Sequence, residues 1–263
     1  MPTAPPFPNI SVVYLLWAPH GPSHVQRFAA AYQRHSAGIS HNLVVAACGA
    51  TDDDDLAAVL VPLASLAPQV EVFDGPRIDL QTYQEAVHRL PATDCFVFMN
   101  SYCEPLANGW VKLLADAAAD DDVGIVGPGG SFESFSSSAP FPLGLLYLPA
   151  YSRFPNPHVR TSCFALSRSS IELVKWPVVT KKAQAHKLES GRNSISRQLQ
   201  KLGRRPLVVG ANGQRYEQSQ WRDSQTFRSG QQQNLLVADL RSRDFDEADT
   251  ERREYLARIA WER

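Results

Sequence analysis

Apolar residues along the chain gather in short runs that alternate with amphipathic stretches. Continuous runs of β-branched and aromatic residues are typical of buried parallel strands, and they occur at 10–17, 42–48, 70–73, 95–99 and 123–127. Helical spacing of apolar residues separates them at 25–35, 80–90 and 108–119, and an acidic helix start follows Gly49. Strands that alternate with helices in this way predict an α/β fold, with a mostly parallel sheet flanked by helices on both faces.

The second half of the chain is less regular. Residues 131–157 are rich in serine, proline and aromatic residues without periodicity, which is typical of a functional or mobile loop. Further elements are predicted as a strand at 160–167, helices at 169–175 and 189–202, a strand at 206–209 and a charged helix at 247–262. We expect one domain over 10–263, made of a first half (10–130), a second half (131–230) and a C-terminal helical extension (231–263).

Composition narrows the class of protein. Of 263 residues, 44% are hydrophobic, so a large core can form, and the net charge of −1 removes any global electrostatic case for nucleic-acid binding. The four cysteines lie in or beside apolar runs and form no Cys-X-X-Cys pair, which predicts buried, reduced thiols. The chain shows no signal peptide and no apolar run long enough to cross a bilayer, so we expect a cytoplasmic protein.

Polar residues follow several predicted strands at the point where each strand ends. In an α/β sheet, ligands bind at the carboxyl ends of the strands. Candidates for contacting a ligand there are Trp17 and Ala18 after the first strand, Asp74, Asp79 and Tyr83 after the third, and Asn100, Ser101 and Tyr102 after the fourth. Asp79 is also suited to cap the helix that begins beside it.

The run from Asp94 to Pro105 resembles the strand that carries the Asp-X-Asp motif in nucleotide-sugar glycosyltransferases of the GT-A fold, which is Rossmann-like. The order of motifs is similar to family 2 of these enzymes: 45–52 matches a Val-Asp-Asp-Gly-Ser-Thr-Asp run, and 188–199 matches a Glu-Asp motif with its following helix. The chain looks like a bacterial subgroup, concerned with polysaccharide synthesis, in which Asn-Ser-aromatic replaces the acidic triplet. The resemblance covers roughly 10–130 and 158–210.

This resemblance implies a hexosyltransferase-type enzyme that moves a sugar from a nucleotide-sugar donor to a glycan or lipid-linked acceptor. Because a phenol stays protonated at neutral pH, Tyr102 cannot serve as a carboxylate ligand. We therefore expect a metal-independent enzyme with no cofactor, in which arginines balance the pyrophosphate. Arg192 and Arg228 are the favoured cations, with surface solvation as the alternative for each.

The Glu-Asp region resembles that of inverting members, in which an acid of the motif is the catalytic base. Glu189 is accordingly the candidate general base, and a role as a helix-start acid that complements the dipole remains an equal alternative. Glu104, His158 and Arg160 are candidates for contacting the acceptor. His20 and His24 are four residues apart, but no third residue completes a metal site with them.

Two other functions stay open. The missing acidic triplet also suits a catalytically inactive glycosyltransferase-like protein that binds a nucleotide sugar or glycan. A sugar nucleotidyltransferase is less favoured, because the loop at 18–23 has a single glycine and no lysine or arginine. A lipid-linked acceptor would bring the protein to the inner face of a membrane as a peripheral contact. The sequence leaves the oligomeric state open.

Overall fold

A computed structural model of the protein describes residues 5–75 and 77–262, so that Arg263 at the end of the predicted domain lies outside it. The main sheet has eight strands in the order β11-β10-β6-β9-β4-β1-β2-β3. Their bounds are β1 Ile10–Trp17, β2 Asn42–Cys48, β3 Gln69–Phe73, β4 Cys95–Met99, β6 Val123–Gly127, β9 Cys163–Ser167, β10 Arg205–Val209 and β11 Arg215–Tyr216. Only β9 and β11 run antiparallel to their neighbours, which confirms the predicted α/β fold with a mostly parallel sheet.

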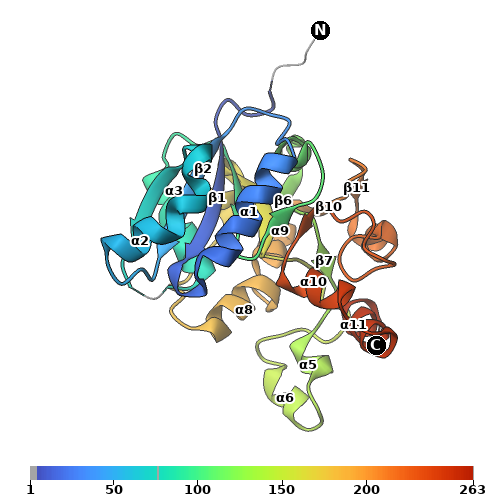
Figure 1. Ribbon diagram of the computed structural model, residues 1–263. Helices are drawn as coiled ribbons and strands as arrows, with labels where there is room; N and C mark the ends of the chain where they lie inside the picture. Colours follow the sequence, from blue (N-terminus) through green and yellow to red (C-terminus); the bar gives the residue numbers. More distant parts are fainter. Residues whose placement is uncertain (1–4, 76, 263) are drawn as a thin grey trace.

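Helices cover both faces of this sheet (Figure 1). The helices are α1 Pro22–Arg34, α2 Asp53–Leu60, α3 Asp79–Arg89, α4 Trp110–Ala118, α5 Phe135–Ser138, α6 Leu143–Tyr147, α7 Arg168–Leu173, α8 Lys182–Ser190, α9 Ile195–Lys201, α10 Leu240–Asp246 and α11 Thr250–Trp261. Short 3₁₀ helices lie at η1 Ala18–His20, η2 Val61–Leu66 and η3 Gln218–Ser224. Apolar residues of α1, α2 and α4 pack on one face, and those of α3, α7, α8, α9 and α11 on the other.

Alternation along the central strand explains this double covering. Val12 and Tyr14 of β1 belong to the first core, whereas Val13 and Leu15 belong to the second. Successive side chains of a strand point to opposite faces, so an unbroken apolar run is buried on both sides. The four cysteines are free and buried, as the sequence predicts.

Two small sheets attach the later segments to this body. β12 Val237–Ala238 pairs with β5 Glu104–Pro105, and β7 Gly130–Ser131 pairs with β8 His158–Val159. The α5–α6 segment projects from the body below the C-terminal helices (Figure 1). No helix in the described ranges is long and apolar enough to span a membrane.

The helix predicted over 189–202 is wrong as a single element. It is two helices, because α8 ends at Ser190 and α9 begins only at Ile195. Gly191 adopts an extended conformation, and the Ser194 hydroxyl then accepts a hydrogen bond from the Arg197 backbone N–H to cap α9. The strand predicted over 160–167 begins later, as β9 at Cys163, and β8 is a separate short strand that precedes the predicted range.

Candidate functional site

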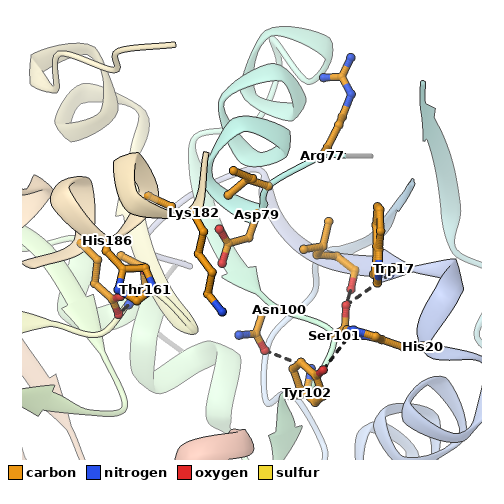
Figure 2. A pocket seen from close by; sticks show the side chains of 14 residues that line it. Trp17, His20, Arg77, Asp79, Asn100, Ser101, Tyr102, Thr161, Lys182 and His186 are labelled. Carbon is orange, nitrogen blue, oxygen red and sulfur yellow. Dashed lines mark hydrogen bonds between the residues drawn. The ribbon is translucent and has the colours of Figure 1, made fainter. Parts of the chain in front are cut away.

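A cavity of about 440 Å³ opens at the carboxyl ends of β1 and β4. Chain connections leave the sheet in opposite directions from these two strands, and such a switch point is where ligands bind in open α/β sheets. We call it the first cavity (Figure 2). Its lining residues are Leu15, Trp17, His20, Arg77, Ile78, Asp79, Asn100, Ser101, Tyr102, Thr161, Lys182, Ala185, His186 and Glu189.

The turn that follows β4 forms the floor of the first cavity. The Ser101 hydroxyl donates to the Leu15 carbonyl at 2.9 Å and accepts from the Trp17 backbone N–H at 3.3 Å. The Asn100 side-chain oxygen accepts from the Tyr102 N–H at 3.0 Å. Ser101 therefore fixes the turn to β1, while the side chains of Asn100 and Tyr102 border the open space.

An aromatic wall stands on one side of this floor. The Tyr102 hydroxyl lies 3.1 Å from His20 Nε2, and the ring centroids of Tyr102 and His24 are 4.7 Å apart. Burial lowers the pKa of both histidines, and the neighbouring His24 lowers that of His20 further. Both imidazoles are therefore neutral at pH 7, and this aromatic wall carries little charge.

The Trp17 indole is held against the loop that follows β2. Gly49 has φ +77°, and a Cβ there would lie 2.7 Å from the Trp17 ring. Only glycine combines this left-handed backbone with such a close approach. Ala47 and Cys48, which stand where the resembled family has acids, are buried in the core and do not reach the cavity.

The wall opposite the floor comes from α8. Ala185 and Leu188 turn into the core, so Lys182, His186 and Glu189 face the first cavity at spacings of four and three residues. Figure 2 shows the Lys182 side chain extending toward Asn100. A lysine at this place brings positive charge to the floor of the cavity.

Asp79 lies beside Lys182 (Figure 2), in the first turn of α3. Burial, together with the charge of Glu189, raises the pKa of Asp79 to about 6, and the Leu80 N–H and Lys182 oppose the rise. The residue that caps α3 is Ile78, and the Asp79 carboxylate accepts from the Leu80 N–H at 2.8 Å. The predicted cap at Asp79 is therefore displaced by one position.

Glu189 is held as a carboxylate. Its Oε1 atom accepts from the Thr161 backbone N–H at 3.1 Å. Burial would raise the pKa of Glu189, but Arg160, then His158 and the Thr161 N–H, bring it below its usual value. The predicted cause is wrong, because Glu189 is in the last turn of α8, so these partners, and not a helix N-terminus, keep it charged.

Several predicted residues lie outside the first cavity. Ala18 is buried at the start of η1, and Tyr83 packs in the core against Phe98 and Phe164. Asp74 is exposed, and its backbone carbonyl accepts a hydrogen bond from Arg77. The strand ends therefore bring together Trp17, Asp79 and Asn100–Tyr102 but not these three residues.

Arg192, a favoured cation for the pyrophosphate, does not line the first cavity beside Glu189. Arg192 is exposed two residues beyond the end of α8, and its Nε donates to the Leu148 carbonyl at 2.8 Å. Glu104 is likewise taken up by an ion pair with Arg243 at 2.5 Å. Arg228, His158 and Arg160 line a different cavity, which also borders Glu189.

Sequence reasoning missed Lys182 and His186. Their signal is the spacing from 182 to 186 to 189, which places three polar side chains on one helical face. Thr161 contributes through its backbone, and no sequence signal marks it. Arg77 and Ile78 enter from the loop before α3, whose path is set by tertiary packing.

No protein-family model matches the chain, and no curated protein matches it in sequence. Its fold resembles the solved mannosyltransferase PcManGT from Pyrobaculum calidifontis in complex with GDP-Man and Mn²⁺, at 15% identity and TM-score 0.47, over 76% of this chain and 54% of that one. It also resembles glucosyl-3-phosphoglycerate synthase from Mycobacterium tuberculosis with Mn²⁺ and uridine diphosphate, at 13% identity and TM-score 0.43, over 74% and 63%. A third similar structure is GalNAc-T7 with UDP, GalNAc and Mn²⁺, at 13% identity and TM-score 0.42, over 63% and 36%. The matches span about a third to two thirds of the length of these transferases.

The predicted absence of a metal cofactor is wrong as it stands, because all three similar structures hold Mn²⁺. The side chains of this chain do not assemble a recognisable metal site in the ranges that the structure covers, which contain no group of three or more His, Cys, Asp or Glu able to hold an ion. At the floor of the first cavity, Asn100 and Tyr102 offer an amide and a phenol rather than the carboxylate pair that suits a hard cation. We derive no step through a metal.

Proposed function

We propose that the chain is a glycosyltransferase that moves a hexosyl group, with inversion, from a nucleotide-sugar donor to a glycan or lipid-linked acceptor. Glu189 is the general base in this proposal. The observation that supports it is the position of a charged carboxylate across the first cavity from the polar floor at the ends of β1 and β4. The catalytically inactive, ligand-binding protein is the alternative, because the floor lacks an acidic triplet.

The donor is proposed to lie along the floor of the first cavity. Trp17 and the wall formed by His20 and Tyr102 suit stacking with flat rings. Lys182 suits the diphosphate, because an ammonium group is a compact charge that binds phosphate oxygens well. The cavity volume of about 440 Å³ is in the range of small-molecule sites.

The chemistry is a single displacement. The acceptor hydroxyl oxygen forms a bond to the anomeric carbon of the donor, and the bond from that carbon to the diphosphate oxygen breaks. The hydroxyl proton passes to Glu189, and the leaving diphosphate takes the bonding electrons. One base on the acceptor side is sufficient for this route, which inverts the anomeric centre.

Binding and turnover separate the candidate functions. Isothermal titration with a panel of nucleotide sugars, with Mg²⁺ or Mn²⁺ supplied and in parallel with EDTA, would identify the donor. Release of nucleoside diphosphate in the presence of an acceptor supports the glycosyltransferase. Tight binding with neither hydrolysis nor transfer supports the inactive protein, and release of pyrophosphate from a nucleoside triphosphate would indicate a nucleotidyltransferase.

Replacing Lys182 by methionine is expected to weaken nucleoside diphosphate binding by about tenfold or more, because a charge-assisted hydrogen bond is lost. Lys187→Met is the matched control, since Lys187 is an exposed lysine of the same helix outside the first cavity. Titration calorimetry measures both. Equal affinities in the two variants would contradict a role for Lys182 at the diphosphate.

Peripheral contact with a membrane is also proposed, through the tip around α6. Phe141, Leu143 and Leu146 there are 88%, 52% and 74% exposed, and the segment projects from the body (Figure 1). At the base of this segment, Arg192 donates a hydrogen bond to the Leu148 carbonyl. Apolar side chains flanked by a cation suit insertion at an anionic lipid surface, which a lipid-linked acceptor requires.

The double substitution Phe141→Ser with Leu146→Ser is expected to reduce sedimentation with phosphatidylglycerol vesicles severalfold. Val61→Ser is the control, because Val61 is 69% exposed on η2, away from the tip. If the tip instead mediates contact between two copies, the double variant will dissociate a dimer in size-exclusion chromatography without changing vesicle binding.

A further inference from the structure

A second cavity of about 270 Å³ lies on the other side of Glu189. Glu189 and His186 line both cavities, so an occupant of the second cavity lies next to the proposed base. Its remaining lining comes mainly from β8, α10, α11 and the loop that carries Arg228. Four arginines contribute to it: Arg160, Arg228, Arg241 and Arg252.

Two of these arginines are paired with carboxylates, although the buried Nε of Arg160, like that of Arg228, has no partner within the described ranges. Arg160 contacts Asp239 at 2.8 Å, and Arg252 contacts Asp244 at 2.9 and 3.2 Å. Arg241 makes no ion pair or side-chain hydrogen bond with the residues that the structure describes. It is exposed at the start of α10, at the mouth of the second cavity.

Arg228 is the unusual member of the group. Its side chain is 3% exposed, and the Glu133 carboxylate is 3.9 Å away, beyond hydrogen-bond distance. Its buried Nε finds no partner within the described ranges. Burial, and next the positive charge of Arg160, lower the pKa of Arg228 to about 10. A buried guanidinium in this condition is stabilised by an anion that accepts its N–H groups.

Contacts on every side fix Arg228 in this place. Its guanidinium lies 5.0 Å from the Phe227 ring centroid, and its backbone N–H donates to the Gln232 side chain at 2.8 Å. Its carbonyl accepts from the Trp261 indole at 3.0 Å. With φ +50°, the backbone adopts a conformation that a non-glycine residue rarely holds without such support. The backbone of Arg228 is therefore held before any ligand arrives, with the guanidinium beside the Phe227 ring.

We propose that the second cavity binds a phosphate group carried by the acceptor, with Arg228 and Arg241 as its ligands. This inference rests on the proposed function and adds the chemical class of the acceptor. Two planar guanidinium groups match the oxygens of a phosphate ester. Anchoring this group beyond Glu189 would place an acceptor hydroxyl between the two cavities, next to the base.

The test measures binding of two soluble phosphate esters by isothermal titration, without any donor. Glycerol 3-phosphate represents a free phosphorylated acceptor, and monomeric dihexanoyl phosphatidic acid represents a lipid-borne phosphate; neutral glycerol is the blank. Arg228→Met is expected to weaken binding of the preferred ester by about tenfold or more. Arg215→Met is the control, since that exposed arginine pairs with Asp120 at 2.6 Å outside both cavities.

The preferred ester distinguishes the two sources of phosphate. Because Arg228 is buried, Arg228→Met could lose ester binding by failing to fold. Arg241→Met, at an exposed residue, tests the same cavity without this risk. Failure of the wild-type chain to bind either ester, or unchanged binding in both variants, would overturn the proposal. Loss of nucleoside diphosphate binding in these variants would also overturn it, because the second cavity would then belong to the donor. Loss of ester binding with intact donor binding leaves the proposed glycosyl transfer untouched.

Discussion

Replacing Glu189 by glutamine is expected to lower the transfer rate by about 100-fold to 10,000-fold, the range that a positioned general base supplies. Nucleoside diphosphate binding should remain, because Glu189 faces the acceptor side of the first cavity and the amide keeps the shape of the side chain. A coupled assay for diphosphate release measures the rate, and calorimetry measures the binding. Glu254→Gln, an exposed acid of α11, is the matched control.

The pH dependence of the rate provides a separate check on the base. Arg160, His158 and the Thr161 N–H hold the pKa of Glu189 below its usual value of 4.5. Because the ionised form accepts the proton, the rate should fall only when the pH drops through that lowered pKa. Asp79, with a pKa of about 6, is the competing carboxylate. An inflection near pH 6 that disappears in Asp79→Asn would assign the role to Asp79 instead.

Replacing Asp239 by asparagine is expected to lower the free energy of unfolding by about 3–5 kcal/mol, because it leaves a buried guanidinium unpaired. The side chains of Arg160 and Asp239 are only 14% and 8% exposed. Asparagine is a good helix cap, so the hydrogen bond that Asp239 accepts from the Ser242 N–H is largely kept and the ion pair is isolated. Thermal unfolding should show a fall of roughly 10 °C.

The matched control is Asp122→Asn, which removes an exposed pair with Arg205 at 2.7 Å. Exposed ion pairs contribute about 0–1 kcal/mol, so this variant should unfold nearly as the wild type does. Partners including Arg160 hold the pKa of Asp239 well below its usual range. Its contribution is therefore present at neutral pH and is lost as the pH falls through that low pKa. If the two variants lose a similar free energy of unfolding at neutral pH, the ion pair between Arg160 and Asp239 does not stabilise the fold.

The strands of the first half follow directly from the sequence. The bounds of β1, β2, β4 and β6 agree with the predicted runs, since each run is unbroken and ends at polar, glycine or proline residues. The same logic located Trp17 and Asn100–Tyr102 at one cavity, because parallel strands bring their carboxyl ends to one edge. Local pattern and sheet geometry were sufficient for that half of the site.

The other half depended on tertiary packing. Ala185 and Leu188 of α8 pack in the core, and these contacts set the position of α8 on the sheet. That position brings Lys182, and not Arg192, to the first cavity. The sequence predicts a helix that continues through Gly191, yet α8 ends at Ser190 and Arg192 is exposed. Spacing alone cannot give the direction in which a side chain points after such a break.

Trp261, at the end of α11, holds the loop that carries Arg228. The Trp261 indole donates to the carbonyls of both Phe227 and Arg228. Residues 15–189 supply every side chain of the first cavity, whereas the loop that carries Arg228 is held by Gln232 and by Trp261, beyond position 260. During synthesis from the N-terminus, the residues that line the first cavity therefore emerge well before Trp261, which helps to hold the loop that carries Arg228.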